Sequence, residues 1–147
     1  MTNAVEIMKS FPLNIDAVSA LMVEHGITPT LQRVKIAQVL FAKPQHLSAE
    51  QVLTKVNETD TRVSKATVYN TLGLFAREGL VREVIVDPAK VFFDPTTVPH
   101  HHFYNVDTGS LMDIDAGAVE LKRLPELPQG TVATGVDVII RIRTPKS

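Results

Sequence analysis

Apolar residues in the first half of the chain recur three and four positions apart, which is the spacing of amphipathic helices. Residues 14–26, 28–43, 47–59 and 64–79 each carry such a stripe, and each stretch opens on or beside a side chain that can cap a helix. The pattern therefore predicts four helices. The expected caps are Asn14, Thr28, Ser48 and Ser64, and Gln51 completes a capping box with Ser48.

The period of the pattern changes after residue 79. Two runs rich in β-branched and aromatic residues, 81–86 and 90–94, flank the turn sequence Asp-Pro-Ala and predict a β-hairpin. Helices followed by such a hairpin are typical of a winged helix-turn-helix, in which the recognition helix enters the major groove. We therefore expect a DNA-binding domain over residues 1–93, with 64–79 as its recognition helix.

A proline-flanked stretch at 94–99 predicts a hinge, and a second unit at 100–147 follows it. A unit of this size buries little core by itself, so we expect it to pair with a second copy. The predicted fold class is α+β: an N-terminal winged helix-turn-helix domain and a small α/β dimerisation domain. The expected elements of the second unit are strands at 100–106 and 110–115, a short helix at 116–124 and a long strand at 131–143.

The composition of the chain mainly excludes certain classes of site and a membrane location. The 147 residues include no cysteine, which excludes disulfides, thiolate nucleophiles and zinc–sulfur sites. No apolar run is long enough for a membrane span and no signal-peptide pattern is present, so we expect a cytoplasmic protein without a membrane partner. The net charge is −1, yet residues 62–82 are locally basic, which is compatible with DNA binding.

The expected recognition helix carries the candidate DNA contacts. Its N-terminal part presents small polar and basic side chains, which suit the major groove. Tyr69 fits either a core aromatic or an exposed contact, and its place beside the apolar row favours the DNA side. Arg33 and Arg77 are candidate phosphate contacts. The full set of candidates is Arg33, Ser64, Lys65, Thr67, Tyr69, Asn70 and Arg77.

Three consecutive histidines open the second unit. His100 and His102 lie two apart on a predicted strand, so their side chains point to one face, and His101 points to the other. Two imidazoles on one face fit either part of a metal site or a polar strand surface. The residues alone leave both interpretations open.

Three segments together resemble the ferric uptake regulator (Fur) superfamily over nearly the whole chain: "TPTLQRVKI", "SKATVYNTLGLFAREGLV" and "HHHFYNVDTGSLMDID". The ending "GVDVIIRIR", the "HHHF" run and the missing cysteines look most like its iron response regulator (Irr) branch. Asn105 and Thr108 stand where typical members have zinc-binding cysteines. The resemblance therefore implies that no structural four-cysteine zinc site is present.

The resemblance also implies a regulatory metal site made by His46, Asp94, His100, His102 and Asp113. These ligand types suit Fe²⁺ or Mn²⁺, and Zn²⁺ can substitute. Asp113 is preferred to its neighbour Asp115, which fits equally well as a helix cap. Asp94, in place of a glutamate, resembles the peroxide-sensing members.

A second metal site, like that of many family members, would use His101, Glu120 and Asp137. The Irr branch is also associated with haem, for which the histidine run is the expected contact.

The function that follows is a homodimeric, metal- or haem-responsive transcription regulator on double-stranded operator DNA of iron-homeostasis or oxidative-stress genes. A metal touching both domains would fix the angle between them and so the spacing of the two recognition helices. Two alternatives remain: a metal-dependent enzyme with a site of two histidines and a carboxylate, and a haem or metal carrier with a degenerate DNA-binding domain.

Overall fold

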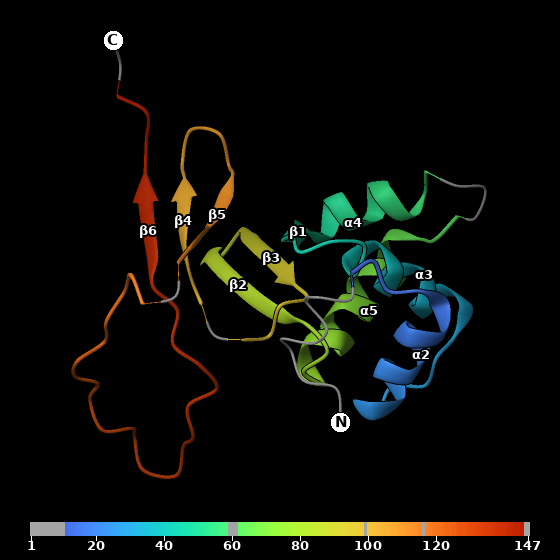
Figure 1. The fold of residues 1–147 in the computed structure, drawn as a ribbon, viewed down its shortest axis with the longest axis horizontal. Coiled ribbons are helices and arrows are strands. Elements are labelled where there is room, and N and C mark those ends of the chain that lie inside the picture. The colour runs from blue at the N-terminus through green and yellow to red at the C-terminus, as the bar shows by residue number, and fades with distance from the viewer. Residues whose placement is uncertain (1–10, 59–61, 99, 116, 146–147) are drawn as a thin grey trace. The chain divides into compact units, whose positions relative to one another are not determined.

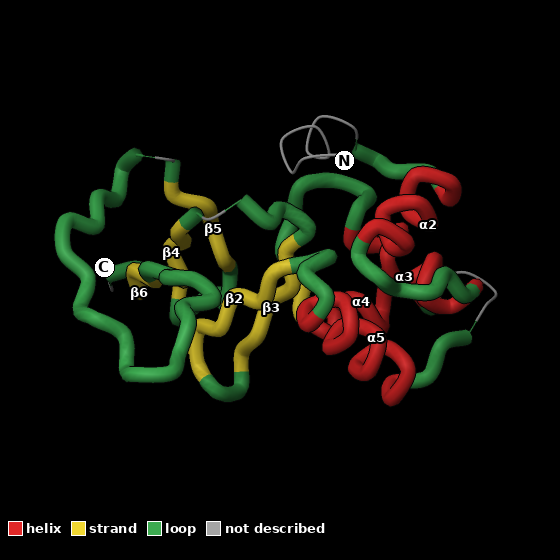
Figure 2. Tube along the Cα trace, turned by 90° about the horizontal axis from the view of Figure 1, so that it is seen from below, coloured by secondary structure: helices red, strands yellow, loops and turns green. Residues whose placement is uncertain are grey.

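The computed structural model describes residues 11–58, 62–98, 100–115 and 117–145. The chain divides into two compact units, Met1–Val98 and Pro99–Ser147. We call them unit 1 and unit 2. The helices all belong to unit 1 within the described ranges, and each unit contains one small sheet (Figures 1 and 2).

Unit 1 contains the four expected helices: α2 (Ile15–Glu24), α3 (Leu31–Leu40), α4 (Ala49–Val56) and α5 (Lys65–Arg77). The predicted caps at Asn14 and Ser64 are confirmed, since each side chain accepts a hydrogen bond from a first-turn backbone N–H. The capping box of Ser48 and Gln51 is complete in both directions.

The predicted N-cap of the second helix was wrong by two positions. Thr30, and not Thr28, caps α3, because the Thr30 hydroxyl accepts from the Arg33 N–H at 3.3 Å. Thr28 instead uses its backbone carbonyl, which accepts a bond of 2.9 Å from the Arg33 guanidinium. The prediction placed Pro29 at the first helical position, but the helix begins two residues later, at Leu31.

The hairpin of unit 1 is confirmed as β2 (Arg82–Asp87) and β3 (Lys90–Asp94), and a third strand adds to it. This strand, β1 (Leu47–Ser48), pairs antiparallel with β3 just before α4 begins. The sheet order is therefore β1-β3-β2, with β3 in the centre. Strand β1 was not predicted, because a two-residue strand carries no periodicity.

The core of unit 1 lies between the helices and one face of this sheet. Its fully buried members include Met22, Ile36, Leu72 and Phe75, and Phe93 contributes from β3. Most residues of the apolar rows predicted for α2, α3 and α5 point into this cluster, whereas Ile15 and Leu31, at the starts of α2 and α3, are exposed. The helices therefore form where they do because a shared core covers their apolar faces.

Unit 2 contains a three-stranded sheet in the order β5-β4-β6. Its central strand β4 (His101–Asn105) pairs antiparallel with β5 (Leu111–Ile114), and both lie within the strands expected at 100–106 and 110–115. It pairs in parallel with β6 (Ile139–Ile142). Most of the chain between β5 and β6 forms an exposed loop.

Two elements expected in unit 2 were wrong. The described residues of 116–124 form no helix, and the long strand expected at 131–143 is limited to Ile139–Ile142. Gly117 has a positive φ of 91°, and Pro125 follows the segment at once. A helix this short needs tertiary packing, and its side chains lie mostly in solvent.

The two faces of the unit 2 sheet have different chemistry. The strand registers align Met112, Phe103 and Ile140 in one row across the three strands. They also align His102 with Asp113 and with Ile139 on the opposite face. One face therefore carries this apolar row together with His101, and the other carries His102 and Asp113.

No helix formed by the described residues combines the length and apolar character needed to cross a membrane.

Candidate metal centre and nucleic-acid surface

Unit 2 brings three of the expected ligands together. His102 lies on β4 opposite Asp113 on β5, and His100 lies one residue before β4. The Nε2 atoms of His100 and His102 lie 3.3 and 3.2 Å from the same Oδ1 of Asp113. The two imidazole rings are 4.4 Å apart between centroids. We call His100, His102 and Asp113 the unit 2 cluster.

These distances match the spacing of ligands around one ion. Nitrogen and oxygen atoms bound at 2.0–2.2 Å to a single first-row metal lie about 3 to 3.5 Å from each other in tetrahedral or octahedral geometry. His102 is fully buried, while Asp113 on the strand rim is largely exposed. The donor set therefore fits a divalent metal. Asp115 is exposed and lies beyond the end of β5, which favours Asp113 as the ligand.

Unit 1 brings the other two expected ligands together. β1 pairs with β3 as Leu47 with Phe93, and continuing this register by one residue sets His46 opposite Asp94. A ligand atom of His46 and one of Asp94 lie within 4.8 Å of one another. The Thr96 N–H donates to Asp94 Oδ1 at 2.8 Å and orients the buried carboxylate. We call His46 and Asp94 the unit 1 pair.

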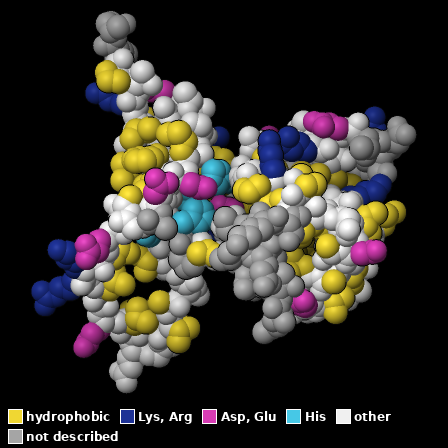
Figure 3. Space-filling view, in the orientation of Figure 1, with side chains coloured by type: hydrophobic (Ala, Val, Ile, Leu, Met, Phe, Trp, Pro, Cys, Tyr) yellow, Lys and Arg dark blue, Asp and Glu magenta, His cyan; other side chains and the backbone are white. Residues whose placement is uncertain are grey.

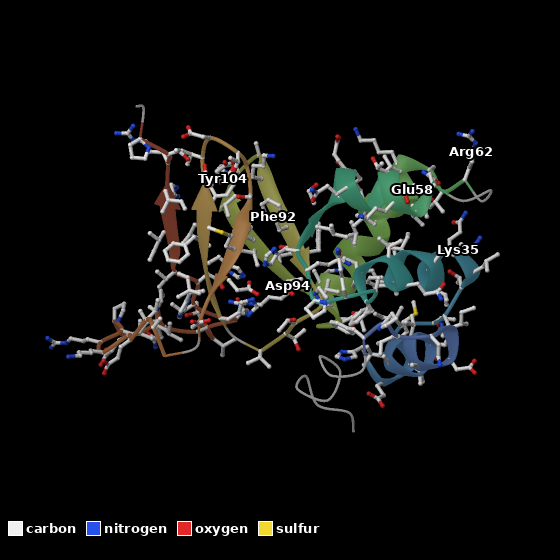
Figure 4. All side chains as sticks on the ribbon, turned by 45° about the horizontal axis from the view of Figure 1, so that its top comes forward. Lys35, Glu58, Arg62, Phe92, Asp94 and Tyr104 are labelled. Carbon is white, nitrogen blue, oxygen red and sulfur yellow. The ribbon has the colours of Figure 1, made fainter. Side chains whose placement is uncertain are left out.

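Asp94 has a third neighbour that the sequence analysis did not assign to the metal site. Arg82 begins β2 and is the direct cross-strand partner of Asp94 on β3. Burial lowers the pKa of Arg82, and the negative charge of Asp94 raises it in partial compensation. The turn sequence alone does not reveal this pair, because the register shifts between Ile85 and Asp87, and the unshifted register would set Glu83 opposite Asp94. Figure 4 labels Asp94 at the end of β3.

The residues predicted for the second metal site, His101, Glu120 and Asp137, are not grouped as those of the unit 2 cluster are. His101 Nδ1 accepts a hydrogen bond of 2.9 Å from the Val138 N–H, so one ring nitrogen ties β4 to the segment entering β6. Asp137 is adjacent to Val138, and Glu120 lies exposed in the long loop. Within the described part of the chain, no group of three potential ligands that includes His101 is close enough to hold an ion.

The candidate DNA contacts lie on α5 and around it. Ser64 caps α5, and its hydroxyl bonds to Thr67. Lys65 and Tyr69 lie on neighbouring turns, with the Lys65 ammonium 5.6 Å from the Tyr69 ring centroid. Tyr69 is 42% exposed and Val68 beside it is buried, so the tyrosine is available to a ligand and is not a core residue.

A hollow of ≈ 270 Å³ adjoins this part of α5. It lies between the first turns of α3 and α5, and Arg33, Thr67 and Asn70 line it. Arg77, at the other end of α5, is exposed. Lys65 also lies 3.9 Å from Glu50 of α4, a contact between exposed groups that contributes little stability. Six of the seven candidates thus cluster at one end of α5, and Arg77 lies apart from them.

Comparison with known proteins identifies the family. The model of the ferric uptake regulator family matches residues 24–132, which is well over half of the chain. The chain belongs to this family. The family resemblance read from the sequence is thereby confirmed, while the Irr branch stays a prediction.

Two curated relatives within this family are similar in sequence. The ferric uptake regulation protein of Pseudomonas aeruginosa is 38% identical over 104 residues, or 69% of this chain and 77% of that protein. The peroxide operon regulator of Bacillus subtilis is 32% identical over 90 residues, or 61% of this chain and 62% of that protein.

A solved structure of the Pseudomonas aeruginosa ferric uptake regulator with manganese matches with a TM-score of 0.65 and 26% identity. The match covers 88% of this chain and 98% of that one. The family fold, a winged helix followed by a small second domain, therefore extends through both units.

Proposed function

We propose that this chain is a metal-responsive transcription regulator that binds operator DNA as a homodimer, and that it is not an enzyme. The observation that carries the proposal is the convergence of both imidazoles of the unit 2 cluster on one oxygen of Asp113. Its geometry suits a metal ion, and the family consists of regulators. Genes of iron homeostasis or oxidative stress are the expected targets.

We propose that the unit 2 cluster and the unit 1 pair would hold one divalent ion together. The cluster would supply three ligands and the pair two, which makes five of the six positions that Fe²⁺ or Mn²⁺ prefers. A relative of known structure was solved with manganese, which supports Mn²⁺ as the first probe. Zn²⁺ has the same ligand types available and is expected to compete.

Metal binding then controls DNA binding through the orientation of unit 1 relative to unit 2. An ion held by ligands from both units would supply the positive charge that offsets the carboxylates of Asp94 and Asp113. In a dimer, that orientation sets the spacing of the two recognition helices, which must match two half-sites. Since the two equilibria share one conformational change, DNA must alter metal affinity by the same factor by which metal alters DNA affinity.

The DNA is contacted by α5. Lys65 and Tyr69 are exposed on its first turns, and Ser64, Thr67 and Asn70 surround them. Arg33 and Arg77 are proposed to bind phosphates. These side chains reach base edges and backbone only if the start of α5 enters the major groove.

The homodimer is supported by the apolar face of the unit 2 sheet. Met112 and Ile140 are 46% and 40% exposed, and Phe103 lies between them in the same row. Hydrophobic side chains gather over the strands and the long loop of unit 2 (Figure 3). An exposed apolar surface of this kind marks an interaction site, and a second copy of unit 2 is the occupant we propose.

The experiment that tests the proposal is selection of binding sequences from a random pool of duplex DNA, with Mn²⁺ and with a chelator. A palindromic consensus is expected, because a symmetric dimer selects two related half-sites. The affinity for that consensus should differ between Mn²⁺ and chelator. Failure to enrich any sequence under either condition would contradict the proposed function.

Matched variants locate the DNA surface. Lys65→Ala and Tyr69→Ala, combined, should abolish selection of the consensus. Lys122→Ala, an exposed lysine on the loop of unit 2, removes the same charge and should leave selection intact. Equal losses in both variants would point to general electrostatics and not to α5.

A further inference from the structure

Three side chains form a row across the unit 1 sheet. The central strand β3 carries Asp94, β2 sets Arg82 directly opposite it on one side, and the β1 register sets His46 opposite it on the other. Residues paired directly across antiparallel strands share a face, and their Cβ atoms lie about 4.5 to 5.5 Å apart. The row therefore reads His46, Asp94, Arg82.

This row lies on the face of the sheet turned away from the helical core. Phe93 of β3 and Leu47 of β1 belong to that core, and the residues alternating with them point the other way. Asp94 is 2% exposed, and Arg82 is partly buried. Charges at such positions are poorly screened by solvent, so the arginine and the carboxylate act strongly on each other.

We propose that Arg82 is a positioning residue that holds Asp94 in the absence of metal and sets how tightly the regulatory ion binds. This inference rests on the proposed function, because it assumes that Asp94 is a metal ligand. Arg82 neutralises the carboxylate while the ion is absent. The fixed positive charge of the guanidinium would oppose an ion bound to the same carboxylate, because like charges repel.

The charges around the site determine whether Arg82 weakens or strengthens metal binding. The two carboxylates of the five-ligand set carry two negative charges, and Arg82 reduces this to one. An Arg beside an Asp typically weakens proton binding to that carboxylate by 1–3 pKa units, or about 10- to 1000-fold, and a metal ion is opposed in the same direction. Arg82 therefore keeps the site weak enough for the ion to leave when its concentration falls.

The experiment is calorimetric titration of the full chain with Mn²⁺. Arg82→Gln removes the charge and should tighten Mn²⁺ binding by about tenfold, by the same electrostatic reasoning. Arg82→Lys keeps the charge and should bind within about twofold of the parent chain. Arg62→Gln, at an exposed arginine in the loop before α5, makes the same charge change elsewhere and should bind like the parent chain.

A second measurement separates this role from a merely structural one. In the metal-free state Arg82→Gln should unfold at a lower temperature, because buried Asp94 loses its neutralising charge. Saturating Mn²⁺ should stabilise this variant more than it stabilises the parent chain, since tighter binding raises stability further. A structural role would lower the unfolding temperature equally with and without Mn²⁺, and that result would overturn the inference.

The outcomes also separate this inference from the proposed function. If Asp94→Asn abolishes Mn²⁺ binding while Arg82→Gln leaves it unchanged or weaker, the inference is overturned and the metal site stands. If Asp94→Asn binds Mn²⁺ like the parent chain, Asp94 is not a ligand, and both this inference and the five-ligand site are overturned.

Discussion

The two units of this chain are stabilised in different ways. Unit 1 has a continuous apolar core between four helices and a sheet, with Ile36, Leu72 and Phe75 fully buried. Among the described residues of unit 2, the buried apolar side chains are limited to Tyr104, Leu111 and Ile114. Its long loop leaves large apolar residues in solvent, and Val132 is 85% exposed.

This difference explains how the family's function is divided. A unit with its own core can present a rigid helix to DNA without help from a ligand. A unit with a small core depends on what it binds for much of its stability, and the proposed function assigns it a second copy and part of the metal site. Under that proposal, most of the metal ligands lie in the part of the molecule whose structure a ligand can change most.

The largest expected effect tests the core of unit 1. Leu72→Ala deletes a fully buried side chain of α5 and should lower the free energy of unfolding by about 2 to 5 kcal/mol, measured by urea denaturation. Leu31→Ala, the same change at a residue 69% exposed, should cost less than about 0.5 kcal/mol. Similar costs for the two variants would contradict the assignment of the core.

The next effect tests the apolar face of unit 2. The double change Met112→Glu and Ile140→Glu should raise the dissociation constant of the dimer by at least about tenfold, because it buries unpaired carboxylates. Analytical ultracentrifugation measures this constant. The control, Ile15→Glu with Val23→Glu, makes the same charge change at exposed positions of α2 in unit 1. A dimer unaffected by the first pair would exclude this face as the interface.

A smaller effect tests whether DNA recognition belongs to unit 1. Lys65→Ala should weaken binding to matched and unmatched duplexes alike if it contacts phosphate, and should reduce the salt dependence of log K by about one per protomer. Fluorescence anisotropy over a range of salt concentrations gives both quantities. An unchanged salt slope would show that Lys65 does not meet the backbone.

The smallest effect tests the local structure of α3. Thr30→Ala should cost about 1 kcal/mol of stability, because the Arg33 N–H loses its cap. Thr28→Ala should cost much less, since Thr28 interacts through its backbone carbonyl. Equal costs measured by thermal unfolding would restore Thr28 as a contributor to the helix start.

The parts of the fold that local physics determines were predicted well. The caps Asn14, Ser48 and Ser64 act within one turn, and the hairpin follows from its own turn sequence, so neither depends on distant residues. Strand β1 depends on pairing with β3, which lies far along the chain. The helix expected at 116–124 had a plausible composition, but there was no core for it to pack against.

In the candidate site, too, the sequence predicted what depends on neighbouring residues and did not predict what depends on distant ones. Alternation along one strand placed His100 and His102 on a common face, and the structure brings Asp113 to both. No pattern in the sequence links His46 to Asp94, because β1 carries no periodic signal, and the family resemblance alone supplied that pair. Whether the five residues bind one ion stays a prediction, as do the second metal site and the haem response.

The most direct test of the account is the coupling between metal and DNA. We predict that Mn²⁺ changes the dissociation constant for the selected duplex by at least about fivefold, and that the duplex changes the Mn²⁺ constant by the same factor. His46→Ala in unit 1 and His102→Ala in unit 2 should each remove this coupling. DNA affinity that is identical with Mn²⁺ and with chelator in the parent chain would contradict the account.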